Sequence, residues 1–365
     1  MSDDPTAHRW LLALGEPRQA LGWSLAEWQR HIRLARRLRL LARLAEGLDA
    51  AGLLDQVPPP ARRHLLAEQQ LSRWRVDALR WAALRVVQAL EPKAYPCVLL
   101  KGAAYVAQGL PIGRGRLPSD LDILVPKAHL DDAQVSLAKT GWDELPTDAY
   151  DQRYYREWSH ELPPMRHPHH AYELDLHHNI LPPVARTSVD AGLLLSRLQP
   201  SPWPGWQVLH PVDQLLHSAA HLFLDAEPRE RLRDLADMDQ LMRHFGVAGA
   251  CPGFWDELPP RAAQLGLAEP LALALHFTAR WFDTPVPEPV RRRVAASGPG
   301  ALRRAWLVPL FGAVLDPTDP DRMPGLPQEA AATLLLARYH LTRLPLRLLL
   351  PHLWRKWRKA GDQTL

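Results

Sequence analysis

The chain has 365 residues, and 47% hydrophobic against 23% charged residues is the composition of a folded globular protein, which excludes a disordered chain. Lys and Arg (44) outnumber Asp and Glu (40) only slightly, which argues against a dedicated nucleic-acid binder, because such a protein carries a larger, clustered excess. Two cysteines, Cys97 and Cys251, are too few for a disulfide framework. Without a signal-peptide pattern or a run of eighteen apolar residues, we expect a cytoplasmic protein with no transmembrane segment.

The first part of the chain, residues 1–92, is expected to be an N-terminal helical region. Ser24 and Glu27 form a capping box, and leucines then recur at helical spacing as far as Leu48. A second helix is expected to follow Pro58 and to run to about residue 91. The first helix carries a row of arginines, which we interpret as its solvated face, with RNA or membrane phosphates as the alternative partners: Arg30, Arg33, Arg36, Arg37 and Arg43.

The stretch from Val98 to Val125 carries the strongest chemical signal. Its apolar start predicts a short buried strand that delivers Lys101 and Gly102 to the strand's end. Small residues then predict a short helix, whose first backbone N–H groups lack partners within the helix and suit an anion such as phosphate. A turn rich in glycine and proline follows and carries Arg116.

The second strand of this stretch contains two aspartates, Asp120 and Asp122. Side chains two residues apart in a strand share a face, so these carboxylates repel each other unless a cation lies between them. A hard divalent metal ion suits such a pair, whereas an isolated pair more commonly marks an exposed strand edge. Because the repulsion would be relieved, Asp122→Ala is expected to leave the fold intact or slightly more stable.

Residues 169–178 alternate between polar and apolar side chains and predict a half-buried strand on which Glu173, Asp175 and His177 share a face. Histidines are frequent here, which raises a zinc site as an alternative. No H-E-x-x-H or cysteine-assisted spacing accompanies them, so we favour zinc hydrolysis less. The histidines concerned are His160, His167, His169, His170, His177 and His178.

These elements together resemble the nucleotidyltransferase fold typified by polymerase beta. More closely, they resemble an uncharacterised bacterial nucleotidyltransferase family in which L-L-K-G-x-A is followed by R-x-x-x-D-[IL]-D-[IL]-L-V. The residues of this chain that match the pattern are Lys101, Gly102, Arg116, Asp120 and Asp122.

The family's third carboxylate commonly precedes Leu-His, which makes Asp175 our choice, with Glu173 on the same face as the alternative. The chain departs from many members of the superfamily at Gly102-Ala103, where they have Gly-Ser. A hydroxyl that would touch the terminal phosphates is therefore missing.

The resemblance implies an α+β protein with a polymerase-beta-like core, a small mixed sheet backed by helices, at residues 93–197. Helical regions at 1–92 and 198–365 would flank this core. The implied activity is metal-dependent transfer of a nucleoside monophosphate from a nucleoside triphosphate to a hydroxyl acceptor on a small molecule, peptide or protein, with release of pyrophosphate. A catalytically silent nucleotide-binding or antitoxin-like module and an RNA-modifying transferase are the alternatives.

The resemblance also implies roles for individual residues. Asp120, Asp122 and Asp175 would be catalytic and hold Mg²⁺, or Mn²⁺ in its place. The triphosphate would be bound by Lys101, Gly102, Ala103, Arg116 and Ser119.

The C-terminal part is expected to consist of helices broken by proline clusters. His221 and Asp237 match a histidine and an aspartate of the family, and we interpret them as a buried hydrogen-bonded pair, with orientation of the base or the acceptor as the alternative. The last segment mixes leucines with basic residues. We expect it to dock on the protein, with an anionic membrane surface or nucleic acid as the alternative partner; its basic residues are Arg343, Arg347, Arg355, Lys356, Arg358 and Lys359.

Overall fold

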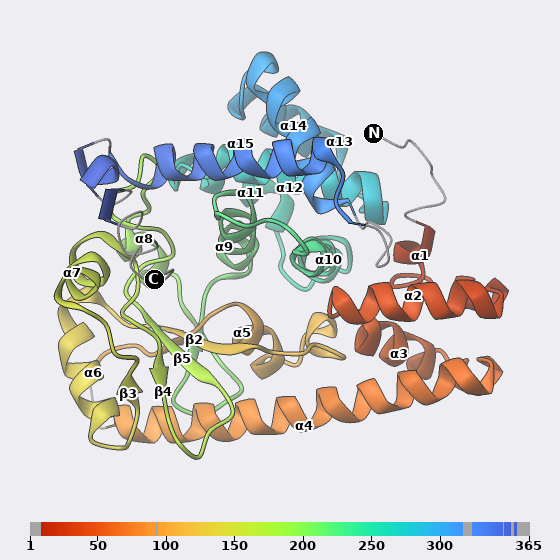
Figure 1. Cartoon of the computed structure of the whole chain (residues 1–365), viewed down its shortest axis with the longest axis horizontal. Coiled ribbons are helices and arrows are strands. Elements are labelled where there is room, and N and C mark those ends of the chain that lie inside the picture. The colour runs from red at the N-terminus through yellow and green to blue at the C-terminus, as the bar shows by residue number, and fades with distance from the viewer. Residues whose placement is uncertain (1–8, 92–93, 317–322, 346, 352–353, 356–365) are drawn as a thin grey trace, which may run out of the picture.

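A small sheet is joined to a mainly helical framework (Figure 1). The structure, a computed structural model, describes residues 9–91, 94–316, 323–345, 347–351 and 354–355. Its helices are α1 (Arg9–Leu12), α2 (Leu25–Arg37), α3 (Leu41–Ala50), α4 (Pro59–Leu90), α5 (Lys101–Ala107), α6 (Leu130–Ala138), α7 (Ala149–Arg153), α8 (Ala191–Leu195), α9 (Pro211–Phe223), α10 (Leu232–Leu241), α11 (Phe254–Gln264), α12 (Ala268–Phe282), α13 (Glu288–Ser297), α14 (Ala301–Leu315) and α15 (Leu326–Arg343). Its strands are β1 (Val98–Leu99), β2 (Asp120–Leu124), β3 (Asp143–Glu144), β4 (Met165–Arg166), β5 (Glu173–His177), β6 (Gln199–Pro200) and β7 (Gln207–Val208).

The sheet is mixed, with strand order β3-β4-β5-β2-β1-β7-β6. Its centre is the parallel pair β2 and β5, in register over five residues, and β1 pairs with β2 in the antiparallel sense. This architecture confirms the predicted α+β class with a small mixed sheet backed by helices. The sheet also includes β6 and β7, which lie within the range expected to be the C-terminal helical region, and the division into three domains stays a prediction.

The continuous helix predicted from Ser24 to Leu48 is wrong. The capping box at Ser24 is present, but α2 ends at Arg37 and α3 begins only at Leu41. Between them Arg39 adopts a left-handed conformation, with φ of 56°. Leu38 and Leu40 are buried on the two sides of this break, so the gain from burying both leucines offsets the cost of the turn.

Helix α4 runs along one edge of the molecule and is the longest element of the described chain (Figure 1). Pro59 and Pro60 occupy its first positions, where a proline lacks only an N–H group that would be unpaired in any case. The helix contacts α2 and α3 near its start and α5, α6 and β2 further along. It therefore connects the N-terminal helices to the sheet.

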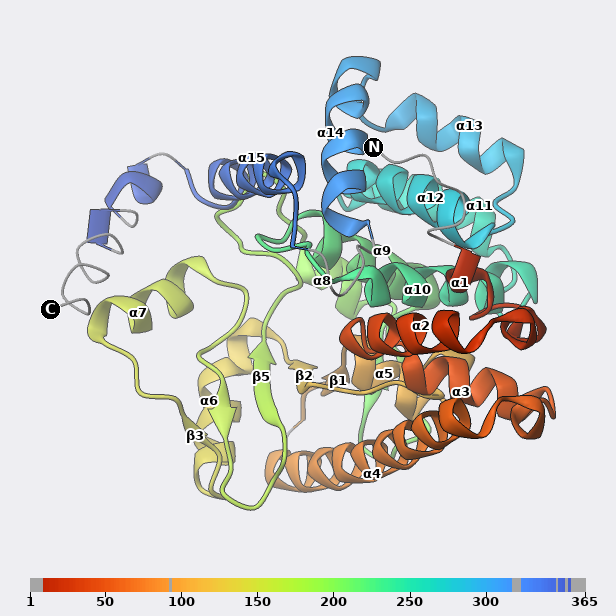
Figure 2. The same cartoon turned by 45° about the vertical axis from the view of Figure 1, so that its right-hand side comes forward.

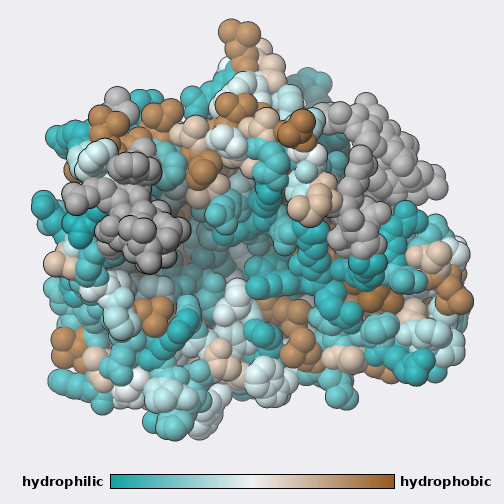
Figure 3. Space-filling view, in the orientation of Figure 1, coloured by the Kyte–Doolittle hydropathy of each residue, from teal (hydrophilic) through white to brown (hydrophobic). Residues whose placement is uncertain are grey.

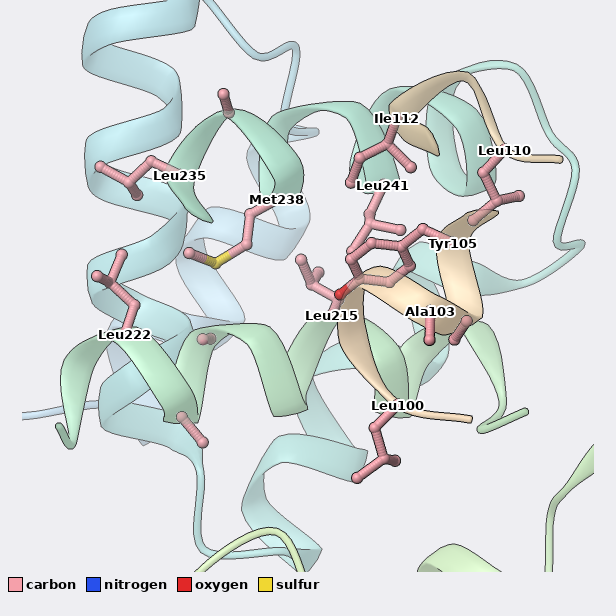
Figure 4. Packing of buried hydrophobic residues seen from close by; sticks show 14 of the residues in the cluster. Leu100, Ala103, Tyr105, Leu110, Ile112, Leu215, Leu222, Leu235, Met238 and Leu241 are labelled. Carbon is pink, nitrogen blue, oxygen red and sulfur yellow. The ribbon is translucent and has the colours of Figure 1, made fainter. Parts of the chain in front are cut away.

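Helix α5 lies between α4 and the C-terminal helices, which gather on its opposite side (Figure 2). Tyr105 of α5 is buried against Leu215 of α9 and Leu241 of α10 (Figure 4). This packing fixes the start of α5, and with it Lys101, relative to α9 and α10. None of the described helices is both long enough and apolar enough to cross a membrane.

Gly115 allows the turn before β2 to pass close to α3. Its φ is 68°, and a Cβ atom at this position would lie 2.6 Å from the backbone carbon and oxygen of Ala42. Gly115→Ala is therefore expected to lower the free energy of unfolding by about 3 kcal/mol, from left-handed strain and the backbone clash together. The matched control is Gly109→Ala, where φ is 64° but no atom lies within 4 Å, so only about 1 kcal/mol is expected. Equal losses in denaturant unfolding would contradict the clash.

Candidate active site

The central strands bring the candidate carboxylates together. In the parallel pair β2 and β5, Asp122 is opposite Asp175, and Asp120 is opposite Glu173. Asp120, Asp122 and Asp175 line one cavity of about 550 Å³. Glu173 is outside its lining and pairs with Arg166, whose Nε lies 2.7 Å from Glu173 Oε1. Of the two candidates for the third carboxylate, Asp175 is the one that faces the cavity.

Asp122 is buried between an ammonium group and an imidazole. Its Oδ1 lies 2.9 Å from Lys101 Nζ and accepts a hydrogen bond of 2.9 Å from His177 Nε2. Burial alone would raise the pKa of Asp122, but Lys101 and His177 outweigh it and hold that pKa well below its usual range. Burial likewise opposes the charge on Lys101, yet Asp122 and Asp120 raise the pKa of this ammonium. Asp122 and Lys101 are therefore a charged pair at neutral pH.

The pKa values of the other two carboxylates, Asp120 and Asp175, are shifted upward. Burial, followed by repulsion from Asp122, raises the pKa of Asp175 to about 7 and also raises the pKa of Asp120. Asp120, Asp122 and Asp175 line the same cavity, and nearby cations compensate their negative charges only in part. Their oxygens provide an all-oxygen donor set, which fits a hard divalent cation such as Mg²⁺.

The lining of the cavity also includes cationic side chains. Seven cationic side chains line it against seven carboxylates, so the cavity balances its charges only while all the carboxylates are ionised. The cations are Arg37, Arg39, Lys101, Arg116, Arg229, Arg231 and Arg233. In the space-filling view, hydrophilic residues surround a hollow in the part of the molecule where α5, α9 and α10 approach one another (Figure 3).

Arg116 is held in place by an ion pair and by a glycine. It is buried, pairs with Asp237 of α10, and lies over the ring of Tyr105 at 5.4 Å from its centroid. Burial lowers its pKa to about 10. A Cβ atom on Gly102 would lie 2.8 Å from Arg116 Nε, so Gly102 leaves the space that the guanidinium occupies.

Seven of the eight site residues predicted from the sequence line this cavity. Ser119 is among them and donates a hydrogen bond of 3.2 Å to Asp120 Oδ1. The exception is Ala103, which is buried among apolar residues and is not part of the lining. Its methyl group packs in the core, and the expected binding of phosphate by its backbone N–H stays a prediction.

The predicted pair of His221 and Asp237 does not form. Both side chains line the cavity, but His221 Nε2 accepts a hydrogen bond of 2.7 Å from Arg231, and Asp237 pairs with Arg116. Asp237 also lies 3.6 Å from Arg43 of α3. The sequence pattern correctly placed both residues on neighbouring helices but could not reveal that arginines would separate them.

The arginines of the first helices are only partly a solvated face. Arg36 pairs with Glu68 at 3.1 Å, and Arg37 pairs with Glu230. Burial lowers the pKa of Arg43 to about 10. These side chains connect α2 and α3 to the rest of the protein.

The basic C-terminal segment is described only in part. Arg355 lies 3.1 Å from Asp148 and over the ring of Tyr150, and Arg343 Nε donates a hydrogen bond of 3.1 Å to the hydroxyl of Tyr154. These contacts agree with the expected docking of the segment on the protein. Its last basic residues lie outside the described residues: Lys356, Arg358 and Lys359.

Several residues of the site carried no sequence signal. Arg39 enters through the left-handed break between α2 and α3, Arg233 comes from α10, and Glu161 comes from the segment before β4. No spacing relates these residues to the aspartates, because the fold alone brings them together. The break between α2 and α3 at Arg39 lies within a run of leucines, and nothing in the local sequence indicates it.

Comparison with models of protein families assigns the chain to one family. The model of the family described as uncharacterised nucleotidyltransferase matches residues 24–283, which begin at the N-cap of α2 and end directly after α12. The match thus includes the helices that precede and follow the central strands along the chain, as well as the strands that carry the carboxylates. Comparison with curated proteins found no match, and comparison with solved structures found none either. The chain belongs to the uncharacterised nucleotidyltransferase family.

Proposed function

We propose that this protein transfers a nucleoside monophosphate from a nucleoside triphosphate to a hydroxyl group of a small molecule, peptide or protein, in a metal-dependent reaction that releases pyrophosphate. One observation carries the proposal: carboxylates from two adjacent parallel strands meet in a cavity that is also lined by cationic side chains. Membership of a nucleotidyltransferase family supports the same chemistry.

Asp120, Asp122 and Asp175 would hold the divalent ions, Mg²⁺ or Mn²⁺. Bound there, the ions supply charge stabilisation to the attacking and leaving oxygens. Lys101 keeps Asp122 ionised and ready as a ligand. Asp175, which lies opposite Asp122 on β5, would complete the metal site and accept the proton that the acceptor hydroxyl loses.

The cationic side chains of the cavity would bind the triphosphate. A nucleoside triphosphate brings about four negative charges, and two divalent ions bring four positive ones, so the balanced cavity stays balanced when both are present. Lys101 is the first residue of α5, Arg116 lies in the turn before β2, and both line the cavity. They would neutralise the charge that develops on departing pyrophosphate.

The RNA-modifying alternative lacks support from the described residues. Its basic surface would have to come from the arginines of α2 and α3 and from the basic C-terminal segment. Arg36, Arg37 and Arg43 are in ion pairs with acidic side chains of the protein itself, and the last basic residues of the C-terminal segment lie outside the described residues. The silent-module alternative leaves three clustered carboxylates without a physical purpose.

Calorimetric titration with each of the four ribonucleoside triphosphates, with and without Mg²⁺, tests the proposal. We expect the wild type to bind at least one triphosphate only when Mg²⁺ is present, and the Asp120→Ala/Asp122→Ala variant to bind none. Absence of binding by the folded wild type would contradict the proposal and favour the silent module.

Arg39→Ala is expected to weaken Mg²⁺-dependent triphosphate binding by about 2 kcal/mol, or about 30-fold, because a charge-assisted hydrogen bond contributes about that amount. Arg39 lines the cavity and is solvent-exposed, so its removal leaves no buried partner unpaired. The matched control is Arg30→Ala, an exposed arginine of α2 outside the cavity lining. A similar loss in both variants, measured by calorimetry, would show a general charge effect instead.

A further inference from the structure

A second cluster of ligand-type side chains lies beside the carboxylate site. We propose that His160, Glu161 and His177 bind a divalent transition-metal ion of the class that zinc represents, at a site separate from the one formed by Asp120 and Asp175. The proposal goes beyond nucleotidyl transfer, because the cluster is complete without a nucleotide and is tested without one.

The backbone holds the cluster together from two sides. Residues 159–162 run antiparallel to the end of β5, with Glu161 bridged to His177. The N–H of Leu162 donates a hydrogen bond of 2.9 Å to Leu176 O, and the N–H of His178 donates one of 2.8 Å to His160 O. Cross-strand neighbours on one face lie close enough for their side chains to interact. The three ligands are therefore presented by fixed backbone rather than by a free loop.

The spacing of the ligand atoms suits a small tetrahedral ion. His177 Nδ1 lies 3.4 Å from Glu161 Oε2, and His160 Nε2 lies 3.7 Å from the same oxygen. Ligand atoms of all three residues lie within 4.8 Å of one another. Ligands about 2.1 Å from a tetrahedral zinc ion are about 3.4 Å apart, which is close to the two spacings measured from Glu161 Oε2.

An unsatisfied nitrogen is the second observation. His177 is 2% exposed, and its Nδ1 is buried without a hydrogen-bond partner in the described part of the chain, although Glu161 is close by. Its other nitrogen, Nε2, is bound to Asp122. A histidine that ligates a metal ion through one nitrogen typically donates its other N–H to a carboxylate, which is the arrangement of His177. The lone pair of Nδ1 is then left for the ion.

The ligand types distinguish this site from the neighbouring one. Two imidazoles and one carboxylate favour zinc and its transition-metal neighbours over Mg²⁺, which prefers oxygen ligands alone. The cluster borders a second cavity of about 150 Å³, which also contains His217 and leaves room for a fourth ligand.

An ion at this position would act on the carboxylate site through His177. With Nδ1 bound to the ion, the proton of His177 stays on Nε2 and the hydrogen bond to Asp122 Oδ1 persists. Lys101 shares the same oxygen at 2.9 Å, so Asp122 is kept ionised from both sides. His177 is thus a positioning residue for Asp122.

Titration of the metal-free full-length protein with Co²⁺, without nucleotide, tests the proposal. We expect one ion per chain to produce the strong visible absorption bands of tetrahedral Co²⁺, which Zn²⁺ removes and excess Mg²⁺ does not. His160→Ala and Glu161→Gln are expected to weaken Co²⁺ binding at least about tenfold. Glu161 is partly exposed, so Glu161→Gln decides the question if circular dichroism shows that His160→Ala does not fold.

Two control variants separate this site from others. Asp120→Ala removes only a carboxylate of the neighbouring site, and His169→Ala removes an exposed histidine from the group that packs near Trp142. Both are expected to keep the tetrahedral bands. Absence of the bands in the wild type, their persistence in Glu161→Gln, or their loss in His169→Ala would overturn the proposal. Because nucleotide is absent throughout, these outcomes are independent of whether the protein transfers nucleotides.

Discussion

Asp122→Ala is expected to abolish Mg²⁺-dependent triphosphate binding and, in addition, to lower the free energy of unfolding by about 3–5 kcal/mol. The first effect exceeds about 100-fold, because even residues that only support metal ligands contribute 10–100-fold to metal affinity. The second follows from the contacts of Asp122, which is buried between Lys101 and His177. Its removal leaves a buried ammonium group without its carboxylate. Repulsion between aspartates alone predicts the opposite, an unchanged or more stable protein.

Asp120→Ala provides the matched comparison on the same strand. Burial and the charge of Asp122 raise the pKa of Asp120, so the folded protein gains little from this carboxylate. We expect triphosphate binding to be lost as in Asp122→Ala, with stability unchanged within about 1 kcal/mol or increased. Denaturant unfolding in the absence of metal measures the difference. Equal stability of the two variants would mean that Lys101 and His177 do not depend on Asp122.

Asp237→Ala is expected to lower the free energy of unfolding by about 3–5 kcal/mol and to weaken triphosphate binding by about tenfold or more. Asp237 pairs with Arg116 and lies 3.6 Å from Arg43, and all three side chains are largely buried. The variant therefore leaves two arginines with little compensation, and Arg116 loses the partner that positions it at the cavity.

Asp213→Ala separates the two effects. Asp213 is fully buried on α9 and accepts hydrogen bonds of 2.7 and 2.8 Å from Arg261 of α11, away from the cavity lining. A similar loss of stability is expected, but the folded fraction should bind the triphosphate as the wild type does. Binding is measured by calorimetry at a temperature where both variants are folded. Unchanged binding by Asp237→Ala would show that Arg116 does not need its partner.

The sequence was sufficient for the residues that are close together along the chain. Lys101, Gly102 and the two aspartates of β2 lie within one strand-helix-strand unit, where strand periodicity and a family pattern place each side chain. Asp175 required more, because the strand pairing places both it and Glu173 opposite an aspartate of β2, and only the cavity lining and the pairing of Glu173 with Arg166 distinguish them. The α+β class followed from the same units.

The rest of the site depends on contacts distant in sequence. Arg116 pairs with Asp237, and Glu161 lies beside His177, through packing of helices and strands that no local spacing encodes. Arg39 enters because burial of neighbouring leucines outweighs the helix propensity of the segment around it. The role of Ala103 stays a prediction, since a small residue after Gly102 suits close packing as well as close approach to a phosphate.

Helix α4 also bears on the order in which the chain acquires its structure. Its hydrogen bonds join residues four apart, so it can form early, and it precedes every strand in the direction of synthesis. The sheet is slower to close, because β1 at Val98 pairs with β7 at Gln207. When the β6–β7 hairpin arrives, the indole of Trp206 donates a hydrogen bond of 3.2 Å to Ala83 O of α4. We therefore expect α4 to form first from local contacts and β6 and β7, the last strands of the sheet, to pack against it afterwards.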